Sequence, residues 1–357
     1  MYGNTWMYFH VPLYHKDHTP MKLRKTLMLL LIIPCMICGC AHNTSGSVIP
    51  VSRTGLYFDT VVSVTLYEYE GSSDRIFDEC FKMCERYESL FSATVPDSDI
   101  WRINNAGGSA VTVDPETAKL ISDALEYSRS SGGLIDPTIG GVCELWDISS
   151  QVASGSYHIP DDESISEALS HVDHEKITVS GNTVTVSDPD AHLTLGFIAK
   201  GYVADRIAEY LAEAGVASAL IDLGGNIKAV GNKPGGLDFH IGIQKPFADK
   251  GEPITTVSVR DASVVSSGVY ERYFTLNDHI YHHIFDTEKG YPVDGNVIGV
   301  TVISSSSEEA DVLSTLCLIT GVEKGLDLIE DTEGVEAMFI TSDYALHASS
   351  GWPDIRQ

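Results

Sequence analysis

The chain has 357 residues, and its 50 acidic side chains outnumber the 23 basic ones to give a formal net charge of −27. Such acidity argues against nucleic acid and against anionic lipid surfaces as partners. Residues 53–357 are too many for one small domain, yet no linker, repeat or low-complexity tract divides them, so we expect one compact, bilobal module.

The N-terminal segment has the features of an export signal. The basic residues Lys22, Arg24 and Lys25 precede an apolar stretch, Leu27–Ile33, that is too short to span a bilayer. The sequence Ile37–Cys40 then resembles a lipobox. These features predict a lipoprotein signal, with Cys40 as the lipidated first residue of the mature chain.

This interpretation divides the N-terminal region into three parts. Residues 1–20 are an extension upstream of the true start at Met21, residues 21–39 are the signal peptide, and residues 40–52 are a lipidated polar tether. The expected location is therefore the extracytoplasmic side of a membrane. An uncleaved hydrophobic anchor is the alternative, and it also places the remainder outside the cytoplasm.

The first elements of the module are a strand and two helices. Leu56–Tyr69 alternates and is rich in Val, Thr and Tyr, which predicts a strand. Asp74–Phe91 predicts a helix in which Cys80 and Cys84 share an apolar face, so we expect core residues rather than a disulfide or a metal site. A second helix is expected over Asp114–Ser130, with Asp as its cap and Pro at its first position.

A glycine-rich turn follows the second helix. Residues 131–140 read SGGLIDPTIG and precede Leu145 and Trp146. An Asp before Pro favours an extended bend, and the glycines let the backbone approach a flat ligand closely. The segment is either a structural turn or one wall of a cofactor site.

Two histidines lie in the next stretch. A helix is expected over Asp161–Val172 and a hairpin over Lys176–Val186. His171 and His174 have no Cys or acidic partner at metal-ligand spacing, so we expect them to be surface residues.

The stretch Leu193–Gly231 has the strongest pattern in the chain. Val203, Ile207 and Leu211 recur at helical spacing, and Gly215 is a stop signal. The polar residues on the other faces of this helix are Lys200, Asp205, Arg206, Glu209 and Glu213. The helix should therefore bury one face against the rest of the fold.

The loop before this helix suits a phosphate. Gly196–Ala199 offers free backbone amides, and Lys200 adds a positive charge. A plain helix-and-strand pair with a solvated lysine is the alternative. After the helix we expect a buried strand over Ala219–Asp222, a turn at Gly224-Gly225 and a second strand over Asn226–Val230.

The second half is expected to contain mostly strands. They are predicted over His240–Gln244, over Thr255–Ser267 as two strands, in a hairpin around Asn277-Asp278, and over Gly299–Ile303, with core helix and strand continuing through Val335–Ile340. Around the end of the hairpin, alternation would put His283 and Phe285 on one face and His282 and Ile284 on the other. No third soft ligand is spaced for a zinc site.

A helix after Ser304–Ser307 carries Asp311 and Thr315. At i, i+4 spacing their carboxylate and hydroxyl lie on one face of the helix, one above the other. Two hard oxygen ligands completed by backbone carbonyls, water and phosphate would suit magnesium.

These segments together resemble the ApbE-type flavin transferases, the FAD:protein FMN transferases, over roughly residues 55–345. The similar motifs are LGFIAKGYVAD (195–205), SGGLIDPTIG (131–140), SGVYER (267–272), HHIFDTEKGYP (282–292) and the helix of Asp311. The resemblance implies an α+β fold with mixed or antiparallel sheets flanked by helices. The chain departs from the family pattern at Asp59 for Gly, Thr194 for Asp, Thr287 for Pro and Asn226 for the more frequent Asp.

The resemblance also implies roles for individual residues. It assigns FAD binding to Phe58, Thr94, Ile135, Asp136, Pro137, Thr194, Lys200, Arg272 and Phe285. It assigns the metal to Asp311, Thr315 and the backbone carbonyl of Phe197, and it places His283 near the pyrophosphate, where it could accept a hydroxyl proton. Arg272 could clamp two phosphate oxygens, and a solvated strand-end arginine is the competing interpretation.

The implied reaction is a Mg²⁺-dependent transfer of FMN from FAD to a Thr or Ser hydroxyl of an exported acceptor flavoprotein subunit, with release of AMP. Two alternatives remain open at this stage. Water could replace the acceptor hydroxyl, which would make the protein a FAD pyrophosphatase. The departures at Thr194 and Asp59 also leave open a non-catalytic flavin-binding lipoprotein.

Overall fold

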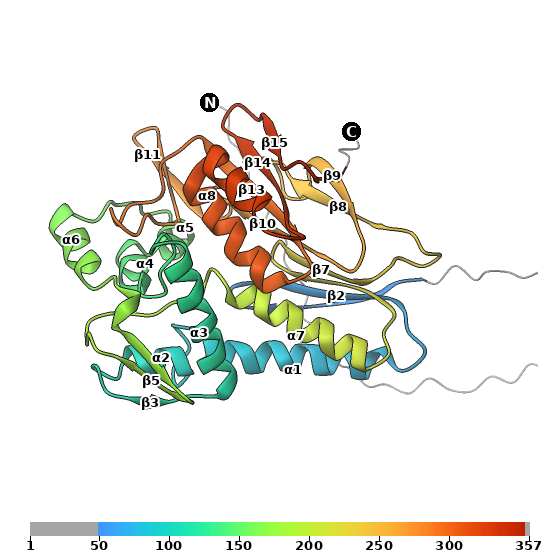
Figure 1. Cartoon of the computed structure of the whole chain (residues 1–357), viewed down its shortest axis with the longest axis horizontal. Coiled ribbons are helices and arrows are strands. Elements are labelled where there is room, and N and C mark those ends of the chain that lie inside the picture. The colour runs from blue at the N-terminus through green and yellow to red at the C-terminus, as the bar shows by residue number, and fades with distance from the viewer. Residues whose placement is uncertain (1–48, 354–357) are drawn as a thin grey trace, which may run out of the picture. The chain divides into compact units, whose positions relative to one another are not determined.

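An eight-stranded sheet is the centre of the computed structural model, which describes residues 49–353 (Figure 1). In spatial order its strands are β1 (Val51–Tyr57), β2 (Thr60–Glu68), β6 (Ser218–Leu223), β7 (Asn226–Gly231), β10 (Ser263–Gly268), β13 (Val297–Ser304), β14 (Glu336–Thr341) and β15 (Leu346–Ala348). Every neighbouring pair is antiparallel. The signal peptide, Cys40 and most of the tether lie outside the described residues, and no described helix is long and apolar enough to cross a bilayer.

Three small antiparallel sheets surround this centre. They are formed by β3 (Val111–Thr112), β5 (Thr183–Val186) and β4 (Ile177–Ser180), by β8 (Phe239–Gln244) with β9 (Pro253–Val259), and by β11 (Tyr273–Leu276) with β12 (His279–His282). The hairpins predicted at Lys176–Val186 and Asn277-Asp278 are confirmed.

Helices cover the sheets. They are α1 (Ser73–Phe91), α2 (Asp99–Asn104), α3 (Pro115–Ser130), α4 (Gly140–Trp146), α5 (Ile148–Ser154), α6 (Asp162–Ser170), α7 (Ala199–Glu213) and α8 (Ser307–Glu330). Helix α8 packs on β10 and β13, while α7 packs on α8, β7 and α1 (Figure 1). The described residues form one compact unit with a large apolar core and a smaller cluster around Trp146, which confirms the α+β prediction.

The local signals of the sequence explain where these helices lie. Val203, Ile207 and Leu211 are fully buried in α7, and Gly215 follows its end with a φ of +79°, a value that L side chains rarely adopt. Asp114 caps α3 by accepting a hydrogen bond from Glu116 N. Cys80 and Cys84 are free and fully buried in α1, as expected for core residues.

One predicted element is wrong. The expected single strand over Leu56–Tyr69 is a hairpin, because Phe58 and Asp59 form a two-residue turn with φ values of 53° and 55°. The sequence lacks the Asn-Gly or Gly that usually marks this turn. A contact distant in sequence holds it instead, since Glu88 of α1 accepts a hydrogen bond from Phe58 N at 2.6 Å.

The packing of α7 on α8 depends on a glycine. A Cβ at Gly201 would lie 2.3 Å from the carbonyl oxygen of Ser307, so only glycine allows the helices to approach this closely. Asp205, expected on a polar face of α7, instead turns toward the start of α8. Its carboxylate accepts hydrogen bonds from Ser307 N and Glu308 N and pairs with Lys228 at 3.1 Å, which caps α8 from outside.

The Gly201 contact can be tested with a matched pair of variants. We expect Gly201→Ala to lower the free energy of unfolding by about 1–3 kcal/mol, because the added methyl group overpacks the helix contact. Gly141→Ala in α4 is the control, since a Cβ there meets no heavy atom within 4 Å. Urea unfolding followed by circular dichroism measures both, and equal stability of the two variants would contradict the close-approach argument.

Candidate functional site

A cavity of about 450 Å³ opens between the start of α7, the side of α8 and the loops around them. A volume of this size is typical of small-molecule sites. Its wall includes most residues that the sequence predicted for the site, namely Phe58, Ile135, Asp136, Thr194, Phe197, Lys200, Arg272, His283, Phe285, Asp311 and Thr315. Segments that are far apart in the sequence therefore converge on one place.

The start of α7 forms one side of the cavity. Thr194, Phe197 and Lys200 line it, and the backbone leading into the helix is held from two directions. The buried side chain of Asn104 donates to Leu193 O and accepts from Leu193 N, while Thr194 N donates to Pro137 O at 2.7 Å. The positive end of the helix dipole and the Lys200 ammonium thus face the same space, an arrangement that suits a phosphate.

The side of α8 contributes a buried carboxylate. Asp311 is 4% exposed, and its Oδ2 accepts a hydrogen bond from Gly201 N at 2.9 Å. Its Oδ1 lies 4.0 Å from Lys200 Nζ, which is beyond hydrogen-bond length. This oxygen is open to the cavity, where it can bind an added cation.

The oxygens around Asp311 fit a hard cation. Thr315 also lines the cavity, one helical turn away, and its hydroxyl lies 3.3 Å from Ser267 Oγ of β10. No hydrogen bond to the Phe197 carbonyl is found within residues 49–353. Carboxylate, hydroxyl and carbonyl oxygens are donors that Mg²⁺ accepts, with water and phosphate completing its shell.

Arg272 and His283 also line the cavity. Nδ1 of His283 lies 3.3 Å from the carbonyl oxygen of Arg272, so Nδ1 carries the proton and Nε2 keeps its lone pair. Burial and the nearby Arg272 guanidinium lower the pKa of His283 to about 3. The ring is therefore neutral near pH 7 and can accept a proton at Nε2.

The histidine segment, residues 282–285, runs from β12 into the cavity wall. Strand β12 ends at His282, which is buried and donates from Nε2 to Val293 O at 3.0 Å. Beyond it His283, Ile284 and Phe285 all contribute atoms to the cavity wall. The side chains of Ile284 and Phe285 belong to different apolar clusters, so the chain still places neighbouring residues on different sides here.

The glycine-rich turn forms the apolar wall. Ile135 and Phe285 line the cavity and are almost fully buried. The departure at Thr287 has a structural role, because its hydroxyl donates to Gly133 O at 2.7 Å and joins this wall to the histidine segment. Trp146 adds a second link by donating from Nε1 to Gly290 O at 2.8 Å.

The carboxylate of Asp136 is already hydrogen-bonded to other residues of the protein. It accepts hydrogen bonds from Thr138 N at 2.8 Å and His174 N at 2.9 Å, and it pairs with the His174 ring at 2.9 Å. His174 is therefore not the free surface residue that the sequence suggested. The contact between Asp136 and His174 anchors the glycine-rich turn, and Ile135, the residue before Asp136, lines the cavity.

Two predicted residues lie away from the cavity wall. Thr94 is exposed, and its backbone N–H and hydroxyl contact Ser92 Oγ. Pro137 is buried and acts through its carbonyl, which receives the Thr194 N–H. The cavity wall also contains Ser267, Glu271 and Asn226, which were not predicted as site residues. Ser267 and Glu271 belong to the motif SGVYER, and Asn226 is one of the positions compared with the family pattern. Their place in these motifs could have identified them as site residues.

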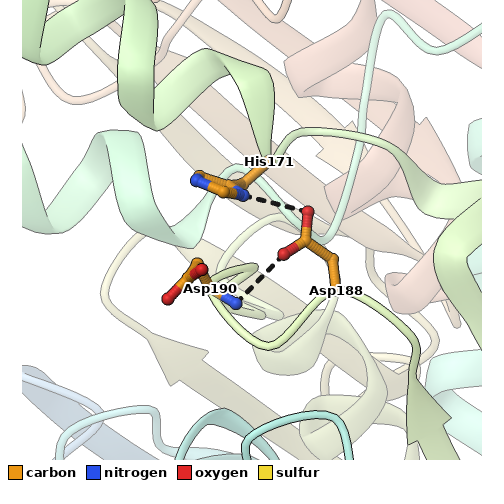
Figure 2. Close-up of side chains that lie close together, drawn as sticks. All are labelled: His171, Asp188 and Asp190. Atoms are coloured by element: carbon orange, nitrogen blue, oxygen red, sulfur yellow. Dashed lines mark hydrogen bonds and ion pairs between the residues drawn. The ribbon is translucent and has the colours of Figure 1, made fainter.

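His171 also has acidic partners, contrary to the sequence expectation. Its Nδ1 lies 2.9 Å from Asp188 Oδ2, and Asp190 is close to both (Figure 2). This trio has the residue types of a metal site. However, Lys176 Nζ contacts the same Asp188 oxygen at 2.9 Å, and Asp190 N donates to the other at 3.0 Å. Asp188 is thus satisfied by the protein, and its hydrogen bond raises the pKa of His171.

Comparison with known proteins gives a consistent result. The family model described as the ApbE family matches residues 58–339. The FAD:protein FMN transferase of Treponema pallidum (strain Nichols) is 34% identical over 342 residues, which cover 90% of this chain and 93% of that protein. The FAD:protein FMN transferase of Klebsiella pneumoniae (strain 342) is 33% identical over 84% of this chain and 92% of its own length.

Solved structures agree with the sequence relatives. The crystal structure of the ApbE protein from Thermotoga maritima has a TM-score of 0.77 at 27% identity and covers 85% of this chain and 97% of its own. The flavin transferase ApbE from Vibrio cholerae has a TM-score of 0.74 at 25% identity, with 85% and 97% covered. The similarity therefore extends over nearly the whole length of those chains.

The protonation state of the site histidine can be measured directly. In the ligand-free protein we expect the ring signals of His283 to stay in the neutral state down to about pH 5, because its pKa is lowered to about 3. The signals of His171 should titrate above the ordinary value of about 6.5, because its pKa is raised. Histidine NMR titration, assigned with His283→Gln and His171→Gln, would contradict this if His283 titrated near 6.5.

Proposed function

Because this chain belongs to the ApbE family, we propose that it is an FAD:protein FMN transferase that moves FMN from FAD to a Thr or Ser hydroxyl of an acceptor protein. The observation that carries the proposal is the cavity itself. It combines the start of α7, the cations Lys200 and Arg272, and the buried carboxylate of Asp311. Such a set binds and polarises a pyrophosphate.

The proposed reaction is a phosphoryl-type transfer. The acceptor oxygen forms a bond to the phosphorus on the FMN side of FAD, and the bond from that phosphorus to the bridging oxygen breaks. The products are a phosphoester between FMN and the protein hydroxyl, AMP with the bridging oxygen, and one proton. No oxidant or reductant takes part, so the flavin ring keeps its redox state.

Some residues of the cavity would bind phosphate, and His283 would accept the proton. Lys200, the start of α7 and the guanidinium of Arg272 would hold phosphate oxygens in the same cavity. Neutral His283 accepts the hydroxyl proton at Nε2, which is free because Nδ1 bonds to the Arg272 carbonyl. Since a hydroxyl is a weak nucleophile at neutral pH, fixed positioning supplies much of the rate.

Magnesium fits the same site. Asp311, Thr315 and the Phe197 carbonyl would hold it, and the bound ion would neutralise pyrophosphate charge during transfer. Support for this assignment comes from Asp311 Oδ1, which opens to the cavity and lies 4.0 Å from Lys200 Nζ, beyond hydrogen-bond length. Gly201 keeps the other oxygen in place through its N–H group.

We further propose that the protein acts outside the cytoplasm as a lipid-anchored protein. The support is the basic and apolar pattern of residues 21–39 and the lipobox that ends at Cys40. The acceptor would then be an exported flavoprotein subunit. Residues 40–50 would join the anchor to the catalytic module, because Val51 and Ser52, predicted as the end of the tether, already belong to β1.

The transferase activity is tested by intact mass. Purified protein is incubated with FAD, Mg²⁺ and a candidate flavoprotein subunit, and we expect the acceptor to gain the mass of one phosphoester-linked FMN while AMP appears. An acceptor with its target hydroxyl replaced by Ala is the control and should gain nothing. FMN and AMP without acceptor modification would indicate a hydrolase, and bound but intact FAD would indicate a carrier; both results contradict the proposal.

The metal assignment is tested by Asp311→Asn. We expect the Mg²⁺ concentration for half-maximal activity to rise by about tenfold or more, because a charged ligand is lost while the side-chain shape is kept. Asp327→Asn is the control, since Asp327 is an exposed carboxylate in the part of α8 that follows the break at Gly321. An unchanged Mg²⁺ dependence in Asp311→Asn would remove Asp311 from the metal site.

A further inference from the structure

Strand β1 is an edge strand without the usual protection. It lies at one end of the eight-stranded sheet and is seven residues long, and among residues 49–353 it pairs with β2 only. The strand at the opposite end, β15, has three residues. Natural sheets protect edges with short strands, prolines, bulges or charges that face the edge, because a long free edge invites another strand to pair with it.

The backbone of β1 offers regularly spaced hydrogen-bonding groups. Tyr57 and Thr60 flank the two-residue turn and so form a hydrogen-bonded pair. Because pairs alternate along an antiparallel ladder, Ser52, Thr54 and Leu56 direct their N–H and C=O groups away from β2. Within residues 49–353 no hydrogen bond satisfies these groups.

The side chains on the same face are uncharged. Leu56 is 78% exposed and lies opposite Val61, which is 47% exposed. The one charged residue of β1, Arg53, points to the other face, where it pairs with Asp74 at 2.7 Å and lies over the Phe77 ring. The guanidinium of Arg53 therefore binds β1 to α1 and does not protect the free edge.

This edge leads directly into the proposed active site. The residues that follow β1, Phe58 and Asp59, both line the cavity. A protein acceptor must bring a hydroxyl to that cavity, and a segment paired with β1 would pass its rim. The turn itself is held against α1 by Glu88, so the direction of the edge relative to the cavity is fixed.

We propose that β1 is the docking strand for the acceptor, whose target segment adds to the sheet in extended form next to Ser52, Thr54 and Leu56. This inference rests on the proposed transferase function. Backbone hydrogen bonds would supply affinity, and the exposed Leu56–Val61 pair would select an apolar residue on the facing side of the segment. The partner is thus an uncharged, extended stretch of the acceptor beside its target Ser or Thr.

Hydrogen exchange in the unmodified full chain tests the docking directly. The enzyme, with FAD and Mg²⁺, is saturated with an acceptor whose target hydroxyl is replaced by Ala, so that the complex persists without turnover. We expect the amides of Ser52, Thr54 and Leu56 to exchange at least about tenfold more slowly, while Arg53 and Gly55, already paired with β2, change little. A complex that leaves these three amides unchanged overturns the proposal.

The same measurement on the enzyme alone excludes other occupants. If the three edge amides are already protected without acceptor, another part of the chain or a second copy covers β1, and the proposal is overturned. Protection of these amides that appears only with the acceptor supports the proposal. Comparing two enzyme concentrations separates a second copy from a segment of the same chain.

Variants then connect docking with transfer. Thr54→Pro removes an outward N–H group and Thr54→Val keeps it, so the difference between them isolates that hydrogen bond. We expect kcat/KM for the acceptor to be about tenfold lower in Thr54→Pro than in Thr54→Val, with equal affinity for FAD. Equal kcat/KM values, or a parallel loss of FAD binding, would overturn the proposal.

A side-chain variant covers the case in which the proline disturbs folding. Leu56→Lys places a protective charge on the edge and should also lower kcat/KM for the acceptor while FAD binding and the unfolding midpoint are kept. An unchanged value in this variant counts against the docking strand. If the unmodified enzyme modifies no acceptor at all, the transferase function fails instead, and the two failures are thus distinguishable.

Discussion

The contact between the first turn of α7 and the side of α8 is the constraint on which the site depends. A buried carboxylate is costly unless it is hydrogen-bonded, and the first N–H groups of a helix have no partner within the helix. Gly201 N and Asp311 Oδ2 satisfy both needs at 2.9 Å. The contact exists only because Gly201 has no side chain to meet Ser307, while Asp205 fixes the start of α8 from the opposite direction.

The two sides of the cavity follow from this contact. Once α7 and α8 are locked, Lys200 Nζ and Asp311 Oδ1 lie 4.0 Å apart on the wall of the cavity. Helix α8 also meets β10, where Ser267 Oγ lies 2.8 Å from Ser314 Oγ. Strand β10 leads into the turn of Arg272, whose carbonyl orients His283. The residues proposed for the site are therefore placed by α7, α8 and β10 and by the turns that these packed elements hold.

The wall of the cavity carries both signs of charge. The chain has a net charge of −27, and the wall contains the cations Lys200 and Arg272 together with the carboxylates of Asp59, Asp136, Asp147, Glu271 and Asp311. An anionic ligand is therefore attracted where the two cations and the start of α7 lie, and a bound divalent cation would offset the carboxylates. The Arg272 guanidinium and the burial of the ring lower the pKa of His283 to about 3, so the ring of the ligand-free protein is neutral near pH 7 and is a weak base.

Patterns that depend on neighbours in sequence were predictable from the chain alone: the α7 stripe that ends at Gly215, the Asp114 cap and the hairpin at Asn277-Asp278. The quoted motifs likewise identified most of the cavity wall. The turn at Phe58 and Asp59 and the inward direction of Asp205 were decided by the tertiary structure. Both depend on partners distant in sequence, Glu88 and the start of α8. Helical periods and caps are local properties, whereas these contacts exist only after the chain has packed.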